Sequence, residues 1–172
     1  RPTPHHHSFR RLASASPDNI ETLLRQKITA VAYETIQTDN GTLPVLMPMS
    51  QIAGRMAANI AAALLRNDRG GKGILLGGVP GVPPAQAVIL GAGVVGTNAA
   101  RAFSGLGASV YVLDHDLAKL ERLSELDSHI ITMVSHAFNV RKAVRFADVL
   151  VGAVLVPGSR APIVVTRDMV RE

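Results

Sequence analysis

Residues 85–114 contain the feature that most constrains this chain, a glycine-rich turn between two apolar runs. The turn reads Gly-Ala-Gly-Val-Val-Gly over residues 91–96, and a stretch of small residues typical of a helix follows it. The second apolar run ends in Asp114, which lies 18 residues after Gly96. This succession of strand, G-x-G-x-x-G turn, helix, strand and acid predicts a βαβ unit that binds a dinucleotide.

Each position of the motif has a physical role in such a unit. Gly91 permits the tight turn, Gly93 lets the main chain approach a pyrophosphate, and Gly96 lets the helix pack closely on the strand. The free N–H groups at the start of the helix, at Val94 and Val95, are expected to face the phosphates.

Asp114 predicts the choice of cofactor. Its carboxylate is placed to accept hydrogen bonds from both ribose hydroxyls of the adenosine, whereas a 2′-phosphate would be repelled and would remove a donor. We therefore expect a preference for NAD(H) over NADP(H), softened by the nearby Lys119 and His115. Asp116 is expected to cap the helix that follows.

Composition fits one compact α/β domain without membrane or nucleic-acid functions. Of 172 residues, 47% are hydrophobic and 3% aromatic, so the core must consist of Val, Ile, Leu and Ala, as in parallel sheets. The absence of cysteine excludes a disulfide framework and a thiolate metal site, and no metal centre is predicted. No apolar run approaches the ~20 residues of a membrane span, so we expect a cytoplasmic protein.

The net charge of +5 is concentrated near the start of the chain. Residues 1–27 contain five basic and two acidic residues, a balance of +3. No basic stripe with interleaved aromatic residues occurs, so nucleic acid is not an expected partner.

The first 43 residues are expected to form two segments distinct from the rest. Residues 1–16 have no helical or strand periodicity and are interpreted as a disordered or non-native tail, in which His5-His6-His7 could bind a metal only weakly. Asp18 and Glu21 form a capping-box pattern that opens a short helix. A strand over 27–37 and a turn over 38–44 follow, and a domain boundary is placed there.

Residues 44–172 alternate between helical and strand patterns. Ser50 is predicted to cap a helix that ends near Leu65, and a packed Gly/Pro-rich loop occupies 70–84. Strands are predicted at 87–90, 109–114, 129–134 and 148–156, with helices at 95–104, 116–126 and 137–147, and a last helix capped by Thr166.

The predicted fold class is therefore α/β, a Rossmann-type doubly wound parallel sheet with strand order 3-2-1-4. Four strands are two fewer than the complete fold has, so we expect the sheet to be incomplete and the chain to be part of a longer one.

Residues 28–172 resemble the NAD-dependent alanine dehydrogenases, which share a superfamily with the nicotinamide nucleotide transhydrogenase α subunits. The resemblance rests on the segments AYETIQ, LPVLMPMSQIAGRMA, GGKGILLGGVPGVPPAQAVILGAGVVGTNAA and ADVLVGAVLVPGSRAP. In that family the cofactor domain is inserted into a substrate domain. The resemblance thus implies that residues 17–43 are a remnant of the substrate domain and 44–172 most of the NAD-binding domain.

The resemblance also assigns cofactor contacts to positions of this chain. It implies that Ser50 lies on the phosphate or nicotinamide side and that Asp114 binds the ribose. Lys119 matches a basic residue near the adenosine, Ser135 a serine beside the adenine, and Val154-Leu155 a backbone pair over the ring and ribose.

No catalytic residue is expected within these 172 residues. In the family, a lysine and a histidine of the N-terminal substrate half and an aspartate beyond the position of Glu172 do the chemistry. His115, His129 and His136 match no catalytic position of the family and are interpreted as surface or strand-end residues.

The implied function is NAD-dependent oxidative deamination of L-alanine to pyruvate and ammonia, with this chain supplying the NAD-binding part. Full-length members of the family form hexamers. Two other hypotheses remain open: a non-catalytic NAD(H)-binding fragment and an AdoMet-dependent methyltransferase, which also uses a glycine-rich turn and a ribose-binding acid. The segment VLVPGSRAP does not suit the methyltransferase.

Overall fold

The computed structural model describes residues 5–8, 17–156 and 161–171, with the side chains of 5–8 excepted. The described residues form two compact units that divide between Met49 and Ser50. We call them the N-terminal unit and the sheet unit, and each is described by itself.

The N-terminal unit is built on two short parallel strands. Strand β1 (His5–Ser8) pairs with β2 (Thr29–Ala32), with His5 opposite Thr29 and Ser8 opposite Ala32. The expectation of an unstructured tail is therefore wrong for His5–Ser8. Strands pair through main-chain groups, so even a run of histidines can form one when a partner strand is available. The His5–His7 side chains, considered above only as weak metal ligands, and the rest of residues 1–16 lie outside the described residues.

The helix of this unit starts earlier than predicted. Helix α1 spans Pro17–Arg25, which places Asp18 inside the first turn, so its predicted role as the capping residue is wrong. Proline is favoured at the first helical position because its missing N–H has no partner there in any case. The predicted strand over 27–37 is also shorter, because the 3-10 turn η2 (Tyr33–Thr35) follows β2 directly.

The sheet unit alternates helices and strands along the chain. Its elements are α2 (Leu46–Leu64, which begins in the N-terminal unit), η3 (Asn67–Arg69), β3 (Gln86–Leu90), α3 (Val94–Gly105), β4 (Ser109–Asp114), α4 (Leu117–Leu126), β5 (Ile131–Val134), α5 (Ala137–Phe146), β6 (Val149–Gly152) and α6 (Arg167–Arg171).

Strands β3 to β6 form one parallel sheet in the order β5-β4-β3-β6, which confirms the predicted order 3-2-1-4. The chain moves outward from β3 through β4 to β5 and then returns to the other side of β3. The carboxyl end of β3 is therefore the topological switch point, where open α/β sheets bind their ligands. In the register of the strands, Leu90 lies opposite both Leu113 and Gly152 at this end.

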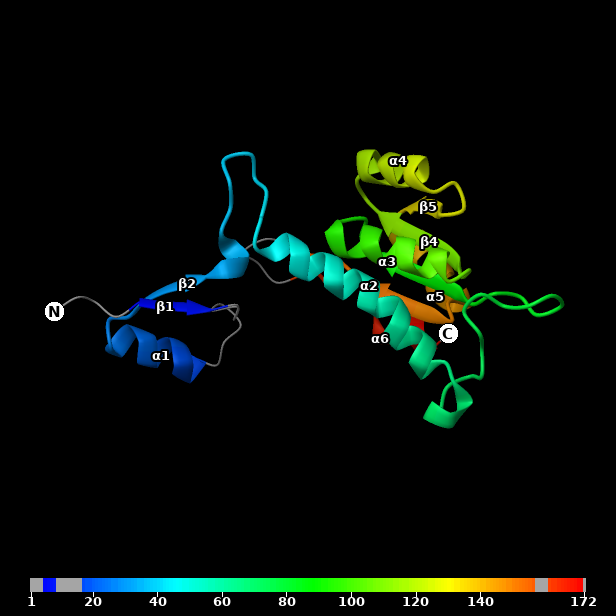
Figure 1. The fold of residues 1–172 in the computed structure, drawn as a ribbon, viewed down its shortest axis with the longest axis horizontal. Coiled ribbons are helices and arrows are strands. Elements are labelled where there is room, and N and C mark those ends of the chain that lie inside the picture. Colours follow the sequence, from blue (N-terminus) through cyan, green and yellow to red (C-terminus); the bar gives the residue numbers. More distant parts are fainter. Residues whose placement is uncertain (1–4, 9–16, 157–160, 172) are drawn as a thin grey trace. The chain divides into compact units, whose positions relative to one another are not determined.

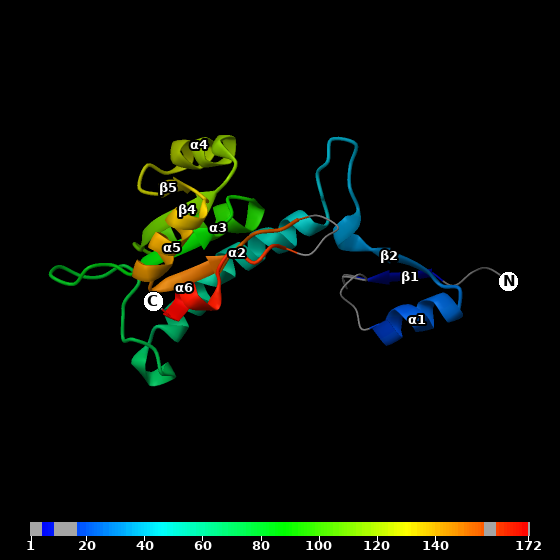
Figure 2. The same cartoon turned by 180° about the vertical axis from the view of Figure 1, so that it is seen from behind.

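Alternate residues of β3 pack into two cores on opposite faces of the sheet. Ala87 and Ile89 are fully buried in a core with residues of α2, α3 and α4, whereas Val88 and Leu90 pack with residues of α5 and α6. The two layers of helices can be followed from the front in Figure 1 and from behind in Figure 2. Strands covered on both faces explain the continuous apolar runs of the sequence.

The Gly/Pro-rich segment between η3 and β3 packs only in part. Leu76 is buried, whereas Leu75 is exposed and Val79 and Val82 form an isolated bridge at the tip. No helix of the described residues is long and apolar enough to cross a membrane.

Candidate functional site

The glycine-rich turn leaves the carboxyl end of β3 in a conformation that only glycine adopts readily. Gly91 has a φ of 107°, and a Cβ on it would lie 2.7 Å from the carbonyl oxygen of Ala153. Its N–H donates to the carbonyl oxygen of Leu113 at 2.7 Å, which extends the β3–β4 ladder by one bond. This is the tight strand-to-helix turn that the sequence predicts.

The other two glycines of the motif meet opposite surroundings. A Cβ on Gly96 would overlap the carbonyl oxygen of Gly91, so α3 can pack on the turn only because this side chain is absent. A Cβ on Gly93 would meet nothing within 4 Å. Gly96 is thus required by the packing of the protein itself, whereas at Gly93 the structure leaves open space where the sequence predicts a pyrophosphate.

Helix α3 begins immediately after Gly93 with its first N–H groups free of helical partners. The first main-chain bond of the helix runs from the Thr97 N–H to the Gly93 carbonyl oxygen at 2.9 Å. The N–H groups of Val94, Val95 and Gly96 precede it and have no acceptor within the helix. Together with the positive end of the helix dipole they can bind an anion.

Asp114 ends β4 beside this turn and is buried, with 6% of its surface exposed. Its Oδ2 accepts the N–H of Ala92 at 2.6 Å, and its Oδ1 accepts the N–H of Asp116 at 2.9 Å. Each carboxylate oxygen has a second lone pair, so the group can still accept the two ribose hydroxyls predicted from the sequence.

The surroundings of Asp114 keep it ionised. Burial by itself raises the pKa of this carboxyl, but the hydrogen bonds from the Ala92 and Asp116 N–H groups and the charges of Lys119 and His115 lower it more. The net effect is a pKa below the ordinary aspartate value. A carboxylate is therefore present at this position at neutral pH.

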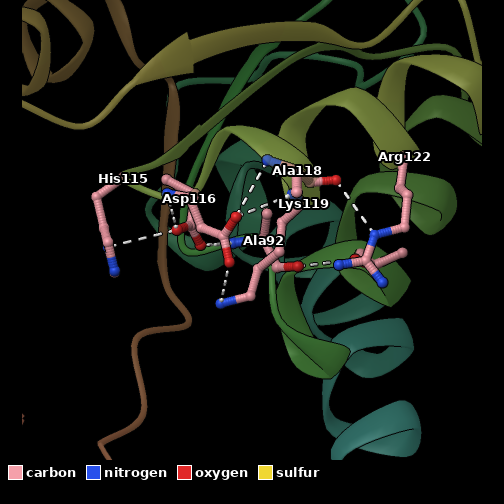
Figure 3. A network of polar contacts seen from close by, with 8 residues as sticks. Ala92, His115, Asp116, Ala118, Lys119 and Arg122 are labelled. Atoms are coloured by element: carbon pink, nitrogen blue, oxygen red, sulfur yellow. Dashed lines mark hydrogen bonds and ion pairs between the residues drawn. The ribbon is translucent and has the colours of Figure 1, made fainter.

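The start of α4 adds basic groups next to Asp114. Asp116 caps the helix as predicted, accepting the N–H groups of Ala118 and Lys119 at 3.1 and 3.4 Å. The Lys119 ammonium lies 3.5 Å from the Asp116 Oδ2, and the His115 Nδ1 lies 3.4 Å from the Asp114 Oδ1 (Figure 3). His115 is mostly exposed, so its ring can reach a ligand at this edge.

Ser135 and Val154, two of the more distant predicted contacts, lie at the same end of the sheet. The N–H of Ser135, just after β5, donates to the carbonyl oxygen of Asp114 at 2.9 Å. Val154 is half-buried and lines an apolar hollow together with Leu90 and Val164. Leu155, the next residue, is exposed. The predicted strand over 148–156 is too long, because β6 ends at Gly152.

Ser50 does not cap α2. The helix starts four residues earlier, at Leu46, and Ser50 lies in its second turn. Pro48 does not prevent this, because it falls in the first turn, where an N–H has no helical partner. One turn further along, Gly54 packs so closely on α3 that a Cβ would overlap the Val95 carbonyl oxygen. Since residues four apart share a helix face, Ser50 lies on the side of α2 that faces the start of α3.

Two residues of interest have no signal in the sequence. Ala92 is an ordinary alanine in the motif, yet its N–H is bonded to a buried carboxylate 22 residues later. In the N-terminal unit, both carboxylate oxygens of Glu34 are buried without a hydrogen-bond partner among the described residues. Both features arise from contacts that only the folded chain makes.

Comparisons with known proteins agree with this geometry. Residues 57–172 match the family described as alanine dehydrogenase/PNT, C-terminal domain. The chain belongs to this family. It is 49% identical over 156 residues to an alanine dehydrogenase of Methanococcus maripaludis and 48% identical over 160 residues to one of Bacillus subtilis. These matches cover 90% and 92% of this chain.

Two solved structures share the fold of this chain. An L-alanine dehydrogenase superposes on 99% of the chain with a TM-score of 0.87 and 45% identity. A transhydrogenase from Sinorhizobium meliloti superposes on 96% of the chain with a TM-score of 0.72, and its 24% identity shows the fold alone. The chain spans 42% of the length of each of the two curated relatives and 47% of the solved alanine dehydrogenase.

Proposed function

We propose that this chain is the NAD-binding part of an alanine dehydrogenase. The observation that supports it best is the switch-point arrangement at β3, where the open space at Gly93, the free N–H groups of α3 and the ionised Asp114 lie together. These are the groups that a pyrophosphate and an adenosine ribose require. The reaction itself is inferred from the family to which the chain belongs.

In that reaction L-alanine, NAD⁺ and water yield pyruvate, ammonium, NADH and a proton. The nicotinamide ring accepts the hydride, and that chemistry belongs to the cofactor. The residues of this chain bind and orient it: the N–H groups at Val94 and Val95 for the pyrophosphate, and Asp114 for the ribose. Ser50, Lys119, Ser135 and the main chain at Val154 and Leu155 would complete the contacts.

Selectivity for NAD over NADP tests this assignment. Titration calorimetry should show NAD binding about one to two decades more tightly, as expected for charge-assisted hydrogen bonds of ~1.5–3 kcal/mol. Asp114→Asn should weaken NAD binding and narrow the gap to NADP, because it removes both the acceptor charge and the repulsion. If the unchanged chain binds the two cofactors with equal affinity, Asp114 does not contact the ribose and its assignment as the ribose-binding residue is wrong.

The chain on its own is proposed to bind NAD without oxidising alanine. The family resemblance places the acid–base residues in segments other than these 172 residues, and orientation together with proton transfer supplies many powers of ten in rate. The measurement is alanine-dependent NADH formation by the purified chain beside NAD binding by calorimetry. Robust turnover would overturn the proposal, whereas binding without turnover is also what a non-catalytic NAD(H)-binding fragment would give.

Adding the complementary segments of a full-length relative separates these two functions. If the chain is the cofactor part of an alanine dehydrogenase, a chimera with both flanking segments of the Bacillus subtilis enzyme should form NADH from alanine. A chimera that binds NAD and stays inactive would favour the non-catalytic fragment.

A further inference from the structure

The Asp114 carboxylate joins two turns that are far apart in the sequence. One oxygen accepts the N–H of Ala92, in the middle of the glycine-rich turn, at 2.6 Å, and the other accepts the N–H of Asp116 at 2.9 Å. Charge-assisted hydrogen bonds of this kind are shorter and about twice as strong as neutral ones. Both oxygens are therefore engaged by the protein itself before any ribose is present.

The bond to Asp114 is the contact that fixes the N–H of Ala92. Gly91 is tied to β4 by its N–H bond to Leu113, and α3 begins its own bonding only with the Thr97 N–H. Ala92 and Gly93 lie between these points. Ala92 is buried in the core and its carbonyl oxygen accepts the Thr97 hydroxyl at 3.2 Å, whereas Gly93 has no side chain to pack. Glycine loses more conformational freedom on folding than any other residue, so a turn of this composition needs an external contact to keep one shape.

The direction of the Ala92 N–H also defines which amides remain for a ligand. Because it is bonded to the Asp114 carboxylate, it is turned toward β4 and is not available to a phosphate. The groups left free are those at the start of α3, which come directly after Gly93. A shift at Ala92 would move these N–H groups, since Gly93 is the only residue between them.

We propose that Asp114 is a positioning residue for the glycine-rich turn: by holding the Ala92 N–H it sets the place of the α3 amides that receive a pyrophosphate. This role is additional to the ribose contact and rests on the proposed function only for the identity of the ligand. The positioning role leads to a prediction that would not follow if Asp114 only bound the ribose. Loss of the carboxylate must lower the affinity for ligands that contain a pyrophosphate more than it lowers the affinity for adenosine.

The experiment compares adenosine, ADP and NAD on the 172-residue chain with Asp114, with Asp114→Asn and with Asp148→Asn. Asp148 is a matched control, because its Oδ2 accepts the Gln86 N–H at the opposite end of β3 at 2.9 Å. We expect Asp114→Asn to lower the affinity for ADP and NAD about tenfold more than the affinity for adenosine. This factor corresponds to the loss of one hydrogen bond to a charged group. Asp148→Asn should leave the three affinities in their original ratios. An equal loss for all three ligands in Asp114→Asn would overturn the proposal.

Amide hydrogen exchange of the ligand-free chain gives a second readout that does not depend on NAD binding. The Ala92 N–H should exchange at least about tenfold faster in Asp114→Asn than in the unchanged chain, and the Gln86 N–H should not. If the unchanged chain binds neither ADP nor NAD, the proposed function fails, and the exchange of Ala92 still decides the positioning role. Unchanged exchange at Ala92 overturns it.

A conservative variant distinguishes the loss of the carboxylate from a general disruption of the fold. Asp114→Glu keeps a carboxylate at the end of β4 and should restore both the slow exchange of Ala92 and the preference for pyrophosphate ligands. If Asp114→Glu behaves like Asp114→Asn while remaining folded, the carboxylate is not what positions the turn, and the proposal fails.

Discussion

At both ends of β3 an aspartate carboxylate accepts a main-chain N–H. At the carboxyl end Asp114 holds Ala92, and at the amino end Asp148 holds Gln86 at 2.9 Å. Asp148 also pairs with Lys72, whose ammonium lies 3.2 Å from its Oδ1. The same type of hydrogen bond, from a main-chain N–H to an aspartate carboxylate, is thus present at both ends of the strand.

The two ends differ in the segments that adjoin the strand. After β3 the chain turns through Gly91 and Gly93 into the start of α3, so free N–H groups and open space stand next to Asp114. At the amino end, Asp148 leads directly into β6 and its second oxygen is occupied by a lysine. A ligand site therefore needs the helix start and the missing Cβ as well as the aspartate.

The largest expected effect tests whether the turn depends on glycine for packing. Gly96→Ala places a Cβ on the Gly91 carbonyl oxygen, and neither main-chain segment can move without disrupting β3 or α3. Overpacking against main chain should lower the unfolding free energy by about 3 kcal/mol, measured by urea denaturation.

Gly93→Ala is the matched control for this substitution. The added methyl meets nothing within 4 Å and the φ of −74° suits alanine, so the unfolding free energy should change by less than about 1 kcal/mol. NAD affinity should nevertheless fall, because the methyl occupies the space predicted for the pyrophosphate. If Gly96→Ala is as stable as the unchanged chain, Gly96 is not required for packing. If Gly93→Ala binds NAD with unchanged affinity, the pyrophosphate does not lie at Gly93.

A second prediction concerns acid stability. The pKa of Asp114 is lowered in the fold, so its ionised form stabilises the protein above the unfolded-state value, and that contribution is lost as the pH falls through the folded-state value. The unfolding free energy should therefore decline with a steeper slope below about pH 4 in the unchanged chain than in Asp114→Asn. Urea denaturation between about pH 3 and about pH 7 measures this, and identical slopes in the two proteins would contradict it.

The smallest effects compare the lysines at the two ends. Lys72 is mostly exposed and Lys119 is half-buried beside Asp116, so replacing either by methionine should change the unfolding free energy by no more than about 1 kcal/mol. Lys119→Met should also weaken NAD binding, whereas Lys72→Met should not, because only Lys119 lies at the predicted adenosine end. If both variants bind NAD equally well, Lys119 has no part in the site.

Sequence patterns predicted the sheet well and the ends of its elements less well. Strand order could be inferred from the β-α alternation, because right-handed crossovers leave few topologies for four parallel strands. Helix starts were misplaced at Asp18 and Ser50, since both helices begin earlier and have a proline in the first turn. Strand β1 was not predicted at all, because its pairing depends on the availability of β2 and not on its own histidines.

The sequence by itself determined the glycine-rich βαβ unit and the location of its acid, because residue type and spacing within one segment are local properties. Only the tertiary structure decided how Asp114 is used. Its bond to Ala92 joins positions 22 residues apart, and it exists because β4 pairs with β3 in one register and brings the end of one strand beside the turn after the other. No local pattern encodes such a contact, since its geometry depends on how the strands pair and on the absence of a side chain at Gly96.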